Sequence, residues 1–179
     1  SIYIRGQLKA LGTARQPIRF LPQKPGKPWG VLAMLRATLG AGPGDVNEMR
    51  YCELTGGGDD TLKGQFFSGM LSAHGCDLTL KHCYLHDNLA EDMFNIKIGK
   101  FLLDSCVFER AFSDGVDFDL ARGTMRNCLV LSSKNDGVDF GFSSGTLVNC
   151  CLLLNGDKNL SVGERSQVVL HHSLVLGAP

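Results

Sequence analysis

Apolar and polar positions alternate over short stretches along most of the chain, and this alternation returns with a fixed period. Three consecutive segments of about 22 residues align without gaps: EDMFNIKIGKFLLDSCVFERAF from Glu91, SDGVDFDLARGTMRNCLVLSSK from Ser113 and NDGVDFGFSSGTLVNCCLLLNG from Asn135. A fourth, DKNLSVGERSQVVLHHSLVLGA from Asp157, continues the register. One repeat is too short for a β-α-β unit, which needs roughly 30 residues, and no repeat has an amphipathic helical pattern. We therefore expect three short strands per repeat, joined by turns.

Aligned at this period, the repeats form columns of similar residues. A polar column lies between two apolar columns, which is the in-out-in order of a half-buried strand. The polar column contains Asn95, Asp117, Asp139 and Ser161. The apolar columns are Phe94, Val116, Val138 and Leu160, and Ile96, Phe118, Phe140 and Val162.

A second pair of columns follows later in each repeat. One contains Cys106, Cys128, Cys150 and His172, and the column before it contains Ser105, Asn127, Asn149 and His171. Without a CxxC pair to supply a metal site, the cysteines are best interpreted as small apolar side chains stacked in a core. The preceding column is typical of a turn ladder, in which asparagine side chains hydrogen-bond from one coil to the next, about 4.8 Å away.

These patterns predict an all-β fold, a right-handed parallel β-helix with coils of about 22 residues, formed by a single domain spanning residues 1–179. Residues 91–176 are the regular coils, and residues 1–50 are irregular first coils broken by proline and glycine. Residues 56–69, GGGDDTLKGQFFSG, are an inserted loop, interpreted either as a ligand contact or as a simple exposed loop. No capping element is apparent, so we expect a longer chain whose ends are covered by further coils or by another chain.

Charge and composition narrow the range of partners. Lys plus Arg and Asp plus Glu both number 18, which gives no net field to attract nucleic acid. The sequence contains no run of 18 apolar residues, so membrane insertion is not predicted, and no secretory signal is present in this fragment. Seven cysteines, an odd number, argue against a disulfide framework.

The coils between about Arg50 and Leu176 resemble the right-handed parallel β-helix superfamily of pectate lyases, polygalacturonases and bacterial surface proteins. SDG from Ser113, the Asn135-Asp136 pair and DKNLSVG from Asp157 are similar in register to polygalacturonase active-site coils. The sequence departs from that pattern at Asn135, where the family has aspartate, and at Lys158, where it has histidine. The resemblance implies an exported or cell-surface protein and a polysaccharide ligand.

Two acidic columns offer the candidate chemistry. The first column contains Asp92, Asp114, Asp136 and Lys158, and the second is the polar column that contains Asp117 and Asp139. Three interpretations remain open for these columns. In the first, paired carboxylates hydrolyse a glycoside. In the second, Asp92, Asp114 and Asp136 hold Ca²⁺ against a uronate while a basic side chain removes a proton. In the third, the Asp-Gly dipeptides form structural turns. The candidate catalytic residues are Asp114, Asp136, Asp117, Asp139, Lys158 and Arg165, with Arg122 as a further possible base.

The sequence thus predicts a scaffold or carbohydrate-binding domain of a larger secreted or cell-surface protein. The alternative is a polysaccharide hydrolase or lyase that uses the acidic columns. A third hypothesis is a protein partner that binds the exposed ends of the stack. Calcium is the one cofactor considered, and nothing predicts a nucleotide site, because no glycine-rich phosphate loop occurs.

Overall fold

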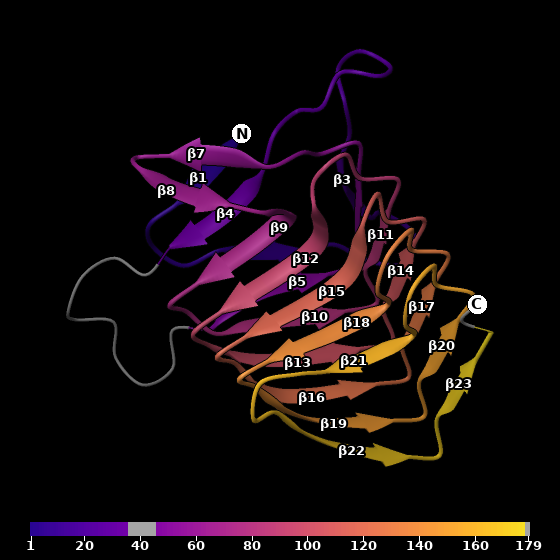
Figure 1. Cartoon of the computed structure of the whole chain (residues 1–179). Coiled ribbons are helices and arrows are strands. Elements are labelled where there is room, and N and C mark those ends of the chain that lie inside the picture. The colour runs from indigo at the N-terminus through magenta and orange to yellow at the C-terminus, as the bar shows by residue number, and fades with distance from the viewer. Residues whose placement is uncertain (36–45, 178–179) are drawn as a thin grey trace.

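The computed structural model describes residues 1–35 and 46–177, which form a parallel β-helix (Figure 1). Within these residues every regular element is a strand. Three seven-stranded parallel sheets wind around a common core, and a two-stranded hairpin projects from the stack. The predicted all-β fold and its parallel β-helix architecture are confirmed.

Each coil contributes one strand to each sheet. Sheet 1 contains β1 (Ile2–Ile4), β4 (Leu32–Leu35), β9 (Gly69–His74), β12 (Asp92–Lys97), β15 (Asp114–Asp119), β18 (Val138–Gly141) and β21 (Leu160–Val162). Sheet 2 contains β2 (Lys9–Leu11), β5 (Asn47–Arg50), β10 (Leu78–Lys81), β13 (Lys100–Asp104), β16 (Arg122–Arg126), β19 (Ser144–Val148) and β22 (Gln167–His171). Sheet 3 contains β3 (Ile18–Phe20), β6 (Cys52–Thr55), β11 (Tyr84–His86), β14 (Val107–Glu109), β17 (Leu129–Leu131), β20 (Cys151–Leu153) and β23 (Leu174–Leu176).

The strand register reproduces the predicted columns. Phe94 pairs with Val116 and Val116 with Val138, while Asp117 pairs with Asp139 in the polar column. The apolar columns are buried from Phe94 to Phe140 because each strand turns alternate side chains inward, where the neighbouring coils cover them, whereas Val162 in the last coil is 48% exposed. Residues one repeat apart in the sequence therefore lie directly above one another along the β-helix axis.

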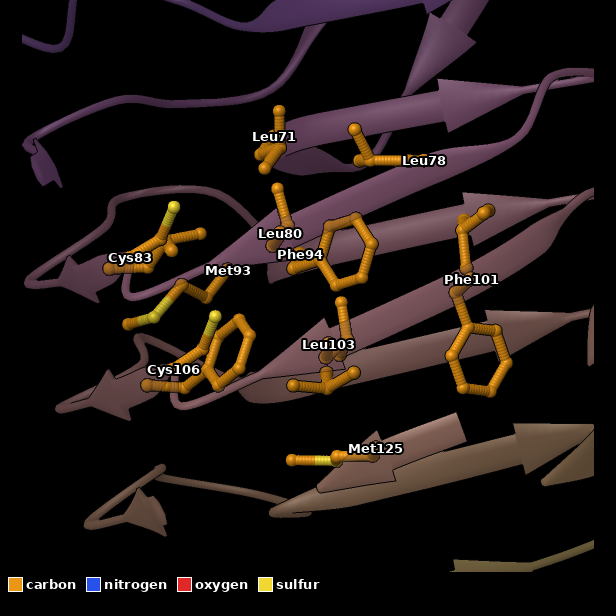
Figure 2. Close-up of a cluster of buried hydrophobic side chains, with 14 of the residues drawn as sticks. Leu71, Leu78, Leu80, Cys83, Met93, Phe94, Phe101, Leu103, Cys106 and Met125 are labelled. Atoms are coloured by element: carbon orange, nitrogen blue, oxygen red, sulfur yellow. The ribbon is translucent and has the colours of Figure 1, made fainter. Parts of the chain in front are cut away.

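Aromatic rings and aliphatic side chains fill the interior between the three sheets. Phe118 lies with its ring centroid 4.0 Å from that of Phe101 and 4.7 Å from that of Phe140, and all three side chains are buried. Figure 2 shows Phe94, Phe101 and Cys106 among leucine and methionine side chains of successive coils. Because the core runs continuously through the stack, each coil depends on its neighbours for burial.

The cysteine column is part of this core. Its thiols are free and buried, as predicted for stacked apolar side chains, and Cys52 and Cys83 of earlier coils extend it. The column consists of Cys52, Cys83, Cys106, Cys128 and Cys150.

The last regular coil is one residue longer than the repeat predicts. Val148 pairs with His171, so the extra residue lies between β21 and β22. His172, whose φ is 48°, therefore occupies the turn ladder, and Ser173 occupies the cysteine column. The predicted placement of His171 in the ladder and His172 in the cysteine column is wrong by one residue.

The turn ladder between sheets 2 and 3 forms as predicted. Asn149 donates from Nδ2 to Oδ1 of Asn127 over 2.9 Å, and Asn127 donates from Nδ2 to Oδ1 of Asp104 over 3.2 Å. Both asparagines have a left-handed backbone, with φ near 53° and 54°. Asparagine tolerates this conformation better than most residues, so one side chain serves both the turn and the stacking.

We expect Asn127→Ala to lower the free energy of unfolding by about 1–2 kcal/mol, because it removes two side-chain hydrogen bonds and puts alanine, which tolerates the left-handed region less well than asparagine, at this turn. Urea unfolding followed by circular dichroism measures the change. Asn127→Gly relaxes the backbone without restoring the hydrogen bonds, so it separates the two contributions. An alanine variant as stable as the wild type would show that the ladder adds nothing.

Residues 56–69 are more ordered than a simple loop. They contain β7 (Asp60–Leu62) and β8 (Gln65–Phe67), which pair as an antiparallel hairpin beside the first strands of sheet 1 (Figure 1). Phe67 is buried against Val31 and Ala33 on the outer face of that sheet, whereas Phe66 points away and is half exposed. The hairpin thus covers one end of the outward polar column.

Candidate functional site

The first acidic column forms a ladder of backbone contacts at the start of the sheet 1 strands. Oδ1 of Asp114 accepts the backbone N–H of Asp136 over 2.8 Å and the side-chain amide of Asn135 over 2.7 Å. Oδ1 of Asp136 in turn accepts the backbone N–H of Lys158 over 2.9 Å. These bonds are those expected of a repeated structural turn.

Two of the three predicted basic residues, Lys158 and Arg165, lie at opposite ends of β21. Lys158 precedes the strand, where its Nζ is 3.4 Å from Oδ1 of Asp136 and also contacts Asp157. The bond to Asp157 raises the pKa of Lys158, so its side chain is a cation at neutral pH. Arg165 follows the strand and lines a groove between sheets 1 and 2. The two side chains therefore do not converge on one carboxylate pair.

The second acidic column carries the more unusual protonation. Burial, together with the nearby charges of Asp92 and Asp119, raises the pKa of Asp117 to about 8. Burial also raises the pKa of Asp92 to about 7 and, to a smaller extent, that of Asp114. At neutral pH the carboxyl group of Asp117 is therefore mostly protonated, and it can donate as well as accept a hydrogen bond.

A buried hydrogen-bond chain leads from the hairpin to this carboxyl group. Nε2 of His74 lies 2.9 Å from Oδ1 of Asn95, and Nδ2 of Asn95 donates to Oδ2 of Asp117 over 2.7 Å. The ring of Phe67 packs 4.6 Å from the ring of His74. Burial lowers the pKa of His74, so its imidazole is neutral, and the chain assigns the ring proton to Nε2.

The hydrogen-bond chain from His74 to Asp117 was not predicted from the sequence. His74 lies outside the gapless repeats, and only alignment of GMLSAH with DMFNIK, across the insertion, would pair it with Lys97, two residues from Asn95 and on the same face of the strand. The burial of Asn95 was equally hidden, because His74, which bonds to it, and Phe67, which packs on His74, both lie outside the gapless repeats. The structure thus joins Asp117 to residues that the periodicity alone does not connect.

A groove of about 480 Å³ follows the corner between sheets 1 and 2 across several coils. It is lined by exposed apolar side chains and by cationic ones, among them Arg122 and Arg165 of the predicted set. A second hollow of about 500 Å³ continues from it over the outer face of sheet 2. The sequence predicted these residues only as possible bases and gave no sign of the groove.

The acidic residues show no arrangement for a metal ion. Within the described ranges no group of three or more His, Cys, Asp or Glu side chains is placed to hold one, and Asp114 and Asp136 direct oxygens at backbone N–H groups. Calcium stays a prediction, and no step below depends on it. The described residues also include no helix of the length and apolar character needed to cross a membrane.

No protein-family model, curated protein or solved structure matches this chain significantly. The function must therefore be inferred from the surfaces of the β-helix itself.

Proposed function

We propose that this chain is a scaffold domain of a larger exported or cell-surface protein, of the pectate lyase-like β-helix superfamily, and that it binds carbohydrate along the outer face of sheet 1. The observation that carries the proposal is the in-register row of Asp117, Asp139 and Ser161 on that face. All three side chains are partly exposed, beyond the part of the column that the hairpin covers.

The row suits a chain of sugar hydroxyl groups. Each hydroxyl both donates and accepts hydrogen bonds, so it needs partners of both kinds. Protonated Asp117 supplies a donor, the carboxyl group of Asp139 supplies acceptors, and the hydroxyl of Ser161 supplies both. Because strands stack about 4.8 Å apart, the row presents these groups at regular intervals to a linear ligand.

Polysaccharide hydrolysis is the second candidate, favoured by the same pair. Asp117 and Asp139 are direct partners in adjacent strands, and the strand spacing of about 4.8 Å approaches the roughly 5–5.5 Å between carboxyl groups of retaining glycosidases. A general acid must be protonated near neutral pH, and a pKa of about 8 meets this requirement for Asp117. Asp139 would then be the nucleophile. The contacts of Asp114 and Asp136 favour a structural role for those two residues.

Affinity electrophoresis through gels containing neutral or uronate-rich polysaccharides tests the proposal. We expect at least one polysaccharide to retard the protein, and Asp139→Ala to weaken the retardation about tenfold through loss of charge-assisted hydrogen bonds. Glu48→Gln removes a carboxylate from sheet 2 and should leave binding unchanged. Retardation without new reducing ends or unsaturated products supports binding without catalysis. New reducing ends that the wild-type protein forms and the Asp117→Asn variant does not form would favour hydrolysis. A folded protein that no polysaccharide retards would contradict carbohydrate binding.

A further inference from the structure

The corner between sheets 1 and 2 exposes a row of large apolar side chains in a left-handed backbone conformation. Ile98, Leu120 and Phe142 occupy the same position in successive coils, with φ of 55°, 50° and 51°. Their side chains are 59%, 53% and 56% exposed. The preceding coil has Gly75 at this position, with φ of 66°.

The turn itself does not require these residues. Glycine adopts this conformation without steric cost, asparagine tolerates it, and a β-branched residue such as Ile98 is among the least suited to it. The equivalent corner between sheets 2 and 3 uses polar residues in the regular coils, namely Ser105, Asn127 and Asn149. Three large apolar residues at this corner are poorly suited both to the left-handed turn and to contact with water. Their exposure in one row therefore indicates a binding surface.

Cationic side chains flank the apolar row. Lys100 and Arg122 are register partners in sheet 2, and Arg165 follows β21 at the same corner. In the part of the chain that the structure describes, none of these three side chains forms an ion pair. Among the described residues, Asp77 is the one carboxylate that lines the groove, and its Oδ1 already accepts the backbone N–H of Lys100 over 2.8 Å. The groove therefore presents uncompensated positive charge beside an apolar floor.

We propose that this corner groove binds an extended acidic peptide segment of a partner protein. Apolar side chains of the segment would pack on Ile98, Leu120 and Phe142, and its carboxylates would pair with the three cations. A glycan fits less well, because Phe142 is the one side chain of the apolar row that offers a ring on which a sugar can stack. A bilayer fits less well because the site is hollowed rather than flat. The surface is separate from the carbohydrate-binding face of sheet 1.

An array of nonapeptides built from Glu, Asp, Leu, Ile and Phe in varied order tests the proposal with the whole chain as the probe. We expect selective binding to acidic apolar peptides, and loss of binding when lysine replaces every acid or serine replaces every apolar residue. The best peptide is then titrated by fluorescence anisotropy. Arg122→Glu should weaken it at least tenfold, whereas Arg15→Glu, an exposed arginine remote from the groove, should not.

The combined variant Ile98→Asn, Leu120→Asn and Phe142→Asn separates binding from folding. Asparagine suits the left-handed backbone, so we expect an unchanged or higher melting temperature together with at least a tenfold loss of peptide affinity. Leu154→Asn is the matched control, because Leu154 has φ of 54° and is 65% exposed at a different corner. Equal binding of acidic and basic peptides, full affinity in the combined variant, or binding to phosphatidylglycerol vesicles without peptide binding would overturn the proposal.

Discussion

Phe118→Ala is expected to lower the free energy of unfolding by about 3–5 kcal/mol, because it removes a fully buried ring from the centre of the stack. The ring of Phe118 lies nearly parallel to that of Phe101, with an interplanar angle of 11°, and crosses that of Phe94 edge-on at 86°. Both neighbours belong to the preceding coil, so the cavity would open between coils. Little relaxation can fill it, since the strand register fixes the surrounding backbone.

Urea unfolding followed by circular dichroism measures this loss, and Phe66→Ala is the control. Phe66 is 50% exposed on the hairpin, so its removal should change the free energy by no more than about 0.5 kcal/mol. The single tryptophan, Trp29, reports on the first coils, and coincident fluorescence and dichroism transitions would show that the stack unfolds as one unit. A loss below about 1.5 kcal/mol for Phe118→Ala would contradict the stacked core.

The regular coils could be predicted residue by residue because a stack of β-strands converts sequence period directly into spatial register. Phe94, Val116 and Val138 share a column in the sequence and pair in the structure. The prediction failed where the period changes. One extra residue between β21 and β22 moved His172 into the turn ladder, and nothing in the composition of that segment signals the shift.

The surroundings of the candidate sites were less predictable, because they depend on contacts between the repeat and segments outside it. The hairpin places Phe67 on His74, which bonds to the buried side chain of Asn95, and no alternation of apolar and polar residues describes this environment. The corner groove was hidden for a different reason. Ile98, Leu120 and Phe142 look like core residues in the sequence, and only their backbone conformation turns them outward.

Asp117 makes the stability of the fold dependent on pH in a direction opposite to that of a salt-bridged carboxylate. Its pKa is about 8 in the folded chain against an ordinary value of 3.8. Below about pH 4 the carboxyl group is protonated in both states and contributes no penalty. Between these values the unfolded chain releases the proton while the folded chain keeps it, so the free energy of unfolding falls as pH rises. Above about pH 8 the folded chain ionises too, and the penalty is complete.

Asp117→Asn should therefore stabilise the protein at high pH and leave it nearly unchanged at low pH. The amide is similar in shape to the protonated acid and can still accept the hydrogen bond from Asn95. We expect a gain on the order of 2–4 kcal/mol at pH 8.5, less than an isolated group would give because Asp92 titrates beside it. Urea unfolding from pH 4 to pH 9 measures the difference, with Asp59→Asn, on the exposed loop, as the control. A gain that is constant across this range would show that the substitution acts through packing and that Asp117 is ionised in the folded chain.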